Sequence, residues 1–481
     1  MKNHPDPAPK DFIRASGRLL MRGAETIRLT GINFPAYGWK RSGYTRHEIL
    51  GAHNFRAEDY RRVAGLGMNV VRLNMSYLLF EQDENPYRYD AEGWDWLDEQ
   101  VNAARAAGVY LMPDIHAPQG GYQAPGYDGD FWENPEPRER LKALWLEIAR
   151  RYRNETQIAA YSLFNEPFTN NRNQLWVTYA RELVEAIRSV DKNHLLDVEQ
   201  DVATMIPFSL PDDNLMYDFH CYEPWRYSTQ FWRYGFQGRY GDPQTPILPW
   251  TWREGENCGA TFKVANEKIA GLMPLAKTLD GLDEFTIEEI EPDGNRQRLI
   301  RVQLVDEPAR PESAPLPVSA SVSDDPFPVA KKSWAVFSPN HFKCEMLAFP
   351  VKQGCIYAIS GGLEFLTLEY NPGDSFAPFT NETIEARLLG EYGLQFYLDN
   401  DLPVNVGEYG LSPHAFKGGR GGRQMLADRL DLYKKYNINS QYWVYSGAAD
   451  FALYDNRGEY PQEQHVNQAL ASLFMEKLKT D

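Results

Sequence analysis

Two glutamates stand at the ends of two apolar stretches that lie far apart in the chain. Residues 158–164 form a short apolar run followed by an Asn-Glu-Pro sequence that contains Glu166, and residues 404–407 lead into Glu408. Runs of this kind are typical of buried strands, and a proline directly after one stops it. Two carboxyl groups about 5–5.5 Å apart can cleave a glycosidic bond by double displacement, one protonating the leaving oxygen and the other attacking the sugar. This chemistry is our first hypothesis for the pair.

Strands and helices alternate along much of the chain, which indicates parallel βαβ units. Helical spacing predicts helices over residues 56–66, 92–107, 136–152, 174–190, 382–398, 424–436 and 462–478. Eight strands are expected near Ile32, Val71, Leu111, Tyr161, Leu196, Phe219, Val406 and Trp443. Regular structure is expected to begin near Ile27. The fold class that follows is α/β, a (β/α)8 TIM barrel.

The alternation breaks after the sixth strand. Short alternating segments and a Pro- and Ser-rich stretch predict a mainly β insertion between strand 6 and helix 6, sandwich-like in character. We therefore expect three parts: residues 11–256 as the first part of the barrel, 257–372 as the insert, and 373–481 as the rest of the barrel. The insert is expected to act as a lid that shapes distal subsites, a binding module and an oligomer contact being the alternatives.

Length and charge restrict the class of protein. The 481 residues exceed one ordinary domain but suit a barrel of about 250 residues with an added module. The net charge of −17 argues against nucleic acid or an anionic membrane as partner and fits a neutral ligand. No run approaches transmembrane length, and residues 1–10 lack the apolar stretch of a signal peptide. The compartment stays open: extracellular if a signal was removed, cytoplasmic otherwise. The oligomeric state is not predicted.

Neither cysteines nor metal ligands form a recognisable framework. Four cysteines give no disulfide pattern and no metal spacing. Cys344 and Cys355 could pair across a hairpin, but we expect two buried thiols. A His-x-His after the first strand with a lysine on the fourth, typical of metal-dependent barrel hydrolases, is absent, so no metal and no cofactor is expected.

Polar side chains gather at the predicted carboxyl ends of the strands, where barrel enzymes place their active sites. They are Arg72, His116, Asn165, Glu166, His220, Tyr222, Glu408 and Trp443. With this set the chain resembles glycoside hydrolase family 5, a family of retaining β/α barrels with the acid/base after strand four and the nucleophile after strand seven. The resemblance covers residues 20–255 and 375–480 and leaves out the insert.

The resemblance implies a role for each residue of the set. Glu166 would be the acid/base and Glu408 the nucleophile, kept ionised by Arg72. His220 and Tyr222 would hold the two carboxylates. The others would serve the sugar: Asn165 at its 2-hydroxyl, His116 at another hydroxyl, and Trp443 as the floor. For Arg72 the alternative is an ion pair at the bottom of the barrel, and for His116 and His220 it is a satisfied histidine in the core. Asp114 is expected to face the barrel interior and to be structural.

Four further tryptophans are candidates for subsite platforms, with core packing an equal alternative: Trp39, Trp132, Trp225 and Trp232. Residues 114–121 and 222–230 are similar to cellulase-type members, so the expected activity is endo-β-1,4-glucanase. β-Mannanase, β-1,3-glucanase, xyloglucanase and glycolipid-directed activities remain alternatives on the same site, because specificity lies in loops. A barrel that binds glycans without cutting them is a more distant alternative, since such proteins usually lose one of the carboxylates.

Overall fold

The computed structural model describes most of the chain. Described are residues 7–35, 55–120, 131–169, 172–202, 204–223, 227–228, 240–241, 248–254, 260–263, 271–278, 284–305, 327–330, 332–333, 343–346, 349–350, 352–361, 363–370, 380–417, 419–447, 451–455 and 460–479. Contacts between Cα atoms divide the chain into two compact units. Unit 1 comprises residues 1–223, 381–416 and 421–481, and unit 2 comprises residues 224–380 and 417–420.

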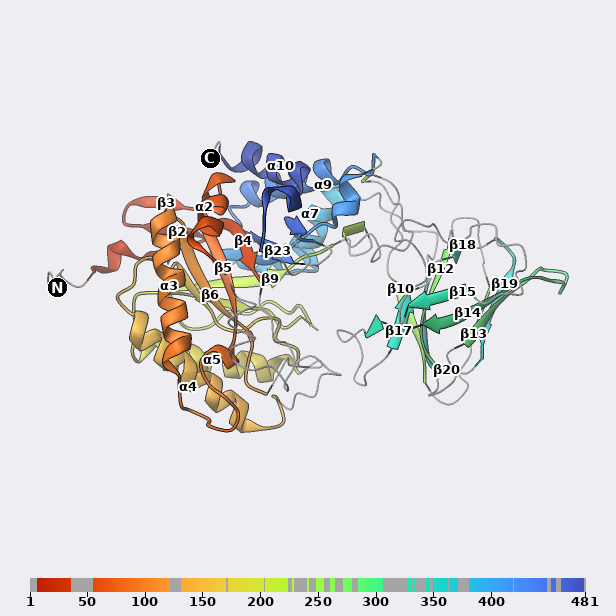
Figure 1. Cartoon of the computed structure of the whole chain (residues 1–481), viewed down its shortest axis with the longest axis horizontal. Coiled ribbons are helices and arrows are strands. Elements are labelled where there is room, and N and C mark those ends of the chain that lie inside the picture. The colour runs from red at the N-terminus through yellow and green to blue at the C-terminus, as the bar shows by residue number, and fades with distance from the viewer. Residues whose placement is uncertain are drawn as a thin grey trace. The chain divides into compact units, whose positions relative to one another are not determined.

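Unit 1 is built on a closed barrel of eight parallel strands (Figure 1). In barrel order the strands are β21 (Val404–Tyr409), β22 (Asn439–Tyr442), β4 (Thr30–Phe34), β5 (Val70–Ser76), β6 (Tyr110–Ala117), β7 (Ala160–Ser162), β8 (Leu195–Glu199) and β9 (Leu215–His220). Each contains one of the predicted strand positions or, for β22, ends directly before it. The predicted TIM barrel is therefore confirmed.

Helices link most of the successive barrel strands. They are α2 (Ala57–Gly65), α3 (Ala91–Ala107), α4 (Pro135–Tyr152), α5 (Asn173–Arg188), α7 (Asn381–Gly390), α8 (Leu394–Asp399), α9 (Gly422–Lys435) and α10 (Gln468–Leu478). Short 3-10 turns are η1 (Pro9–Asp11), η2 (Tyr77–Leu79), η4 (Pro413–Phe416) and η5 (Glu463–His465). Of the helices in the described residues, none is both long and apolar enough to cross a bilayer.

Local sequence explains the limits of several helices. Asn134 accepts a hydrogen bond from the N–H of Glu136 and caps α4, whose first residue is Pro135. Gly108, with φ of 72°, ends α3 in the left-handed conformation that glycine adopts without cost. The predicted helix over residues 382–398 is wrong in one respect. It is interrupted after Gly390 and begins again at Leu394, because Gly393 takes a φ of 70°.

A three-stranded sheet that the sequence analysis missed precedes the barrel. It consists of β1 (Ile13–Ser16), β2 (Leu19–Arg22) and β3 (Glu25–Ile27), joined in antiparallel pairs. Regular structure thus begins well before Ile27. These strands are short and only partly buried, so they carry little of the alternation that predicts a strand.

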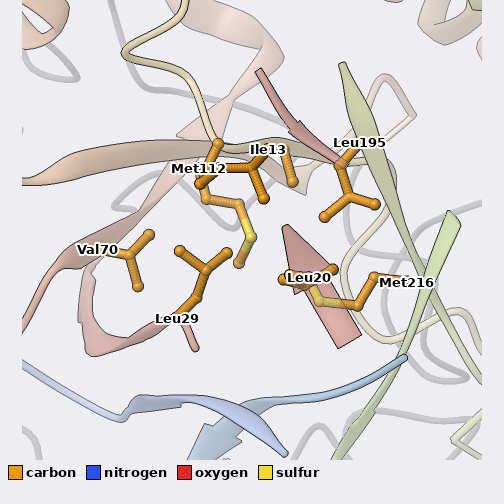
Figure 2. Close-up of a cluster of buried hydrophobic side chains, with 9 residues drawn as sticks. Ile13, Leu20, Leu29, Val70, Met112, Leu195 and Met216 are labelled. Atoms are coloured by element: carbon orange, nitrogen blue, oxygen red, sulfur yellow. The ribbon is translucent and has the colours of Figure 1, made fainter. Parts of the chain in front are cut away.

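This sheet packs its apolar side chains against the amino ends of the barrel strands. Figure 2 shows the cluster. Its buried members are Ile13, Leu20, Leu29, Val70, Met112, Ala159, Ala160, Leu195 and Met216. Because several of them are the first or second residues of their strands, the cluster lies at the end of the barrel opposite the strand tips that carry the polar residues.

Unit 2 contains two further sheets, all of whose pairings are antiparallel except that of β14 with β15. One sheet contains β10 (Leu248–Glu254), β20 (Leu363–Tyr370), β12 (Gly271–Thr278), β17 (Lys343–Met346), β16 (Lys332–Ser333) and β18 (Phe349–Pro350). The other contains β11 (Ala260–Lys263), β19 (Ile356–Ser360), β13 (Glu284–Ile290), β14 (Arg296–Val305) and β15 (Phe327–Ala330). A separate two-stranded pair in unit 1 is formed by β23 (Ser446–Gly447) and β24 (Tyr454–Asp455).

The pairing of β10 bears on where the insert begins. β10 lies in the range assigned to the barrel from sequence, yet it pairs with β20 in a sheet of unit 2. The proposed insert, residues 257–372, falls inside the wider bounds of unit 2. In the same unit Cys355 is a buried free thiol, as expected.

The three-stranded sheet β1–β3 gives a first prediction. Leu20 is fully buried in the cluster at the amino end of the barrel, so Leu20→Ala should lower the free energy of unfolding by ~2–5 kcal/mol. Urea titration followed by far-UV circular dichroism measures it. Met21→Ala, at the neighbouring half-buried position, is the matched control and should lower the free energy of unfolding by less. Equal costs at the two positions would show that the sheet does not pack as described.

Candidate active site

The two glutamates predicted from sequence meet at the carboxyl end of the barrel. Glu166 follows β7 in the chain, and Glu408 is the fifth residue of β21. One carboxylate oxygen of each, together with a ring nitrogen of His220, lie within 4.8 Å of one another. The carboxylate of Glu408 is nearly inaccessible at 5% exposure, whereas that of Glu166 is 24% exposed. The pair is therefore close and unequally solvated.

Arg72 is the buried cation beside this pair. Its guanidinium, which extends from β5, is fully buried and donates to the carboxylates of Asp114, at 3.0 Å, and Glu408, at 3.2 Å. It also donates to the side-chain oxygens of Asn33, at 3.1 Å, and Asn165, at 3.0 Å. A guanidinium with four such acceptors holds their side chains in fixed orientations. The alternative that Arg72 forms an ion pair remote from the strand tips is excluded by its bond to Glu408.

Glu408 is held by donors on both of its oxygens. The phenol of Tyr222 donates to Oε2 at 2.6 Å, and Arg72 donates to Oε1. Burial raises the pKa of Glu408 and the nearby Glu166 adds to the rise, while the positive charges of His220 and Arg72 oppose it. The preceding residue must be glycine, because a Cβ on Gly407 would stand 2.1 Å from a carboxylate oxygen of Asp218.

Glu166 is bonded through both its side chain and its backbone. Nδ1 of His220 lies 2.9 Å from its Oε1, and its backbone N–H donates at 2.8 Å to Oε2 of Glu199, the last residue of β8. Its φ of 45° is in the left-handed region, which is unusual for a residue other than glycine. Backbone strain of this kind is common at functional sites.

His220 lies among several carboxylates. Its ring nitrogens are 3.4 Å from Glu199 and 3.5 Å from Glu408, in addition to the bond to Glu166. Burial alone would lower the pKa of His220, but these carboxylates outweigh burial and raise the pKa to about 10. At neutral pH the ring is therefore a buried imidazolium.

His116 and Trp443 form one wall of the site. Their rings are stacked with centroids 5.3 Å apart and an angle of 12° between the planes. His116 Nδ1 lies 3.0 Å from Asp114, which in turn accepts from Asn74 and Arg72. Asp114 is fully buried, and the positive charge of Arg72 outweighs burial and lowers the pKa of its carboxyl. All eight predicted residues of the strand tips thus belong to one connected group.

Two groups of three metal-type ligands occur among the described residues. One is Glu166, His220 and Glu408, and the other is Glu199, Asp218 and His220. Both share His220, so both fall within the network around the two glutamates.

Three residues of the network were missed from sequence. Asn33 accepts from Arg72 and donates to the backbone oxygen of Gly407, Asn74 bridges Asn33 and Asp114, and Glu199 contacts Glu166 and His220. Asn33 and Glu199 stand near or at the ends of apolar strands, the same signal that revealed Glu166. Asn74 lies inside β5 and carries no such signal.

Of the four candidate subsite tryptophans, Trp132 is the one that lies in the described residues. Trp39, Trp225 and Trp232 lie outside the described residues. Trp132 packs edge-on against Phe131, Trp176 and Tyr179 and borders an open hollow of about 770 Å³. The rest of the hollow is lined by residues of α4 and α5 and the segment between them, so a sugar-stacking role for Trp132 stays a prediction.

Comparison with known families identifies the barrel. The family model described as "Cellulase (glycosyl hydrolase family 5)" matches residues 36–256, which include Arg72, His116, Glu166 and His220. Residues 36–256 thus match a glycosyl hydrolase family 5 domain. The second carboxylate, Glu408, lies outside the matched range and is placed by the closure of the barrel.

Relatives with similar sequences carry related names. Cellodextrinase A of Ruminococcus flavefaciens is 29% identical over 42% of this chain and 60% of its own length. Endoglucanase C of Acetivibrio thermocellus is 27% identical over 42% and 59%. A β-xylosidase of Phanerodontia chrysosporium is 34% identical over 30% and 31%. The chain thus spans less than two thirds of the length of each of these relatives.

Solved structures of this family share the fold. Thermotoga maritima Cel5A in complex with cellobiose matches 93% of this chain and 97% of its own, with a TM-score of 0.51 and 15% identity. The same enzyme in complex with mannotriose gives a TM-score of 0.50 at 14% identity over the same shares. At this level of identity the match supports the family 5 barrel fold and nothing finer.

The raised pKa of His220 gives a prediction about stability. The folded state holds a proton on His220 that the unfolded state releases near pH 6.5. The contribution of this proton to the free energy of unfolding is therefore complete below pH 6.5 and is lost as the pH rises towards 10. In that window the free energy of unfolding should fall by up to about 1.4 kcal/mol per pH unit.

Urea unfolding at pH 7, 8 and 9 measures this slope. His220→Gln should flatten it, and His465→Gln, a substitution on η5, is the control that should leave it unchanged. Parallel slopes for wild type and His220→Gln would contradict a charged His220.

Proposed function

We propose that the chain is a retaining glycosidase acting on neutral β-linked glycans. The observation that carries the proposal is the separation of Glu166 and Glu408, whose nearest ligand oxygens lie within 4.8 Å. Retaining enzymes hold their carboxyl groups about 5–5.5 Å apart, whereas inverting enzymes leave about 6.5–9.5 Å to admit a water molecule. The close pair favours double displacement through a covalent glycosyl-enzyme.

In the first step Glu408 attacks the anomeric carbon while Glu166 gives its proton to the leaving oxygen. The attacking group is assigned from its surroundings, because Glu408 receives the donors Arg72 and Tyr222, which favour the ionised form. Glu166 is the more solvent-accessible member of the pair. The bond from the sugar to the leaving oxygen breaks as the ester to Glu408 forms.

In the second step Glu166, now ionised, takes a proton from water, and the water oxygen displaces Glu408 from the sugar. Asn165 is suited to hold the sugar 2-hydroxyl. Arg72 can only donate, so its bond fixes the amide oxygen of Asn165 and with it the orientation of the amide group. Trp443, stacked on His116, is suited to form the floor beneath the sugar ring, and His116 to contact another of its hydroxyls.

For the substrate we propose a β-1,4-linked glucan cut at internal bonds. The names of the relatives, endoglucanase and cellodextrinase, support this choice, and the solved Thermotoga maritima enzyme was captured with cellobiose. The net charge of −17 disfavours anionic polysaccharides. Mannan is the first alternative, because the same solved enzyme was also captured with mannotriose. β-1,3-Glucan, xyloglucan and glycolipids come after it.

Activity assays on soluble β-glucan, β-mannan, xyloglucan and laminarin test this function. We expect the highest kcat/KM on β-1,4-glucan, with the β-anomer of the product appearing first in proton NMR. Glu166→Gln should lower kcat/KM by about 10²–10⁴-fold, the range of general acid catalysis, and Glu408→Gln by at least as much. A 2-deoxy-2-fluoro cellobioside should label Glu408 covalently.

Asp197→Asn, a substitution of a buried carboxyl group on β8, is the control for a change to a buried polar residue outside the pair. First release of the α-anomer would contradict the retaining assignment. Binding of the glycans without turnover would instead favour the glycan-binding alternative.

The pH dependence follows from the raised pKa of Glu408. The nucleophile must be ionised, so the acid limb of the kcat/KM profile should have its midpoint above 4.5, the ordinary value for glutamate. Tyr222→Phe removes a hydrogen bond to the ionised form and should move this midpoint upward by about one pH unit. A midpoint below 4.5 in the wild type, or a downward shift in the variant, would contradict the assignment.

A further inference from the structure

A third carboxylate, that of Glu199, lies beside the proposed acid/base. It belongs to the last residue of β8 and is 2% exposed. The strand end is fixed independently, because the backbone oxygen of Glu199 accepts a hydrogen bond from the indole of Trp176 at 2.7 Å. Buried carboxylates are costly unless they are bonded, so the contacts that this one makes require an explanation.

The first contact restrains the backbone of Glu166. Oε2 of Glu199 accepts the N–H of Glu166 at 2.8 Å, and this N–H belongs to the residue with φ of 45°. A left-handed conformation costs a residue with a Cβ of the order of 1 kcal/mol and persists only where its surroundings hold it. A bond from a carboxylate to the backbone N–H is strong enough to do so.

The second contact acts on the side chain of Glu166 through His220. The same Oε2 of Glu199 lies 3.4 Å from Nε2 of the imidazole, whose Nδ1 is 2.9 Å from Oε1 of Glu166. The ring thus lies between two carboxylates: Nδ1 is bonded to Glu166, and Nε2 is in ion-pair contact with Glu199. A buried acid that orients an imidazole towards a reacting group is a recurring arrangement in hydrolases.

We propose that Glu199 is the positioning residue that sets both the backbone and the side-chain orientation of Glu166, an inference that rests on the proposed glycosidase function. A single oxygen fixes the acid/base from two directions, through its N–H and through the imidazole. Glu199 also supplies the negative charge that balances the imidazolium, so that His220 can bond to Glu166 without leaving a net positive charge beside it.

The charge balance around His220 involves residues from several strands. The groups that face it are Glu166 after β7, Glu199 on β8, Asp218 on β9 and Glu408 on β21, with Arg72 as the cation nearest to the carboxylates. Burial raises the pKa of Glu199 well above its usual range; Asp218 and Glu166 add to the rise, and the imidazolium and Arg72 oppose it. The ionised form of Glu199, paired with the imidazolium, disfavours ionisation of Glu166, so removing that charge should favour the ionised form of Glu166.

The test compares two substrates whose leaving groups differ in their need for a proton. Cellotetraose needs general acid catalysis, whereas 2,4-dinitrophenyl β-cellobioside has a leaving group that departs without it. In Glu199→Ala, kcat/KM on cellotetraose should fall by between about 10-fold and the 10⁴-fold limit of general acid catalysis. On the dinitrophenyl substrate it should fall by less than about threefold, because attack by Glu408 is untouched.

A second variant separates the charge from the hydrogen bond. Glu199→Gln keeps an oxygen that can accept the N–H of Glu166 but removes the negative charge. It should lose less activity on cellotetraose than Glu199→Ala, and the alkaline limb of its kcat/KM profile should move to lower pH. Titration with the dinitrophenyl 2-deoxy-2-fluoro cellobioside counts competent sites and corrects for any misfolded fraction, since labelling needs Glu408 alone.

Asp197→Asn is the matched control, because Asp197 is a buried carboxyl group two residues earlier on the same strand. This substitution should lower kcat/KM on the two substrates equally, if at all. The proposal would be overturned if kcat/KM of Glu199→Ala fell equally on both substrates or stayed at the wild-type value. It would also be overturned if the alkaline limb of the Glu199→Gln profile did not move. A wild-type chain inactive on both substrates would instead overturn the proposed function itself.

Discussion

The buried guanidinium of Arg72 is the charge on which the polar end of the barrel depends. A guanidinium removed from water must find acceptors, and each buried carboxylate beside it must find donors, or several kcal/mol are lost per group. Arg72 meets this requirement through Asn33, Asp114, Asn165 and Glu408. These four residues come from β4, β6, the segment after β7, and β21. The network can therefore form only when the barrel closes in one register.

The two ends of the barrel divide stability and chemistry between them. At the amino end the small sheet β1–β3 covers a cluster of aliphatic side chains, which stabilises the ring of strands without polar groups (Figure 2). At the carboxyl end the strands finish in charged residues whose burial would be unfavourable alone. The apolar end, where the strands begin, thus offsets the cost of the charged end, and substitutions at the two ends should affect different properties.

The sequence reveals the barrel and most of the site because both leave a pattern in a single strand. An apolar run that ends in a polar residue predicts Glu166 and Glu408. Glu199 carries a weaker form of this pattern, because Asp197 interrupts the run before it. The sheet β1–β3 leaves a weaker signal, since its strands have three or four residues and one exposed side. Asn74 depends on contacts between strands, which no single stretch encodes.

The surroundings of the two glutamates account for their different roles. Both lie close to His220, and the positive charge of His220 alone therefore does not distinguish them. Glu408 has Arg72 and Tyr222 in addition and is almost fully buried, which makes it a carboxylate with fixed geometry. Glu166 is more exposed, and the balance of His220 by Glu199 leaves it free to carry a proton or give it up. An acid/base must change its charge twice in each turnover, whereas a nucleophile must begin each turnover ionised. The asymmetry of donors around the pair meets these two requirements.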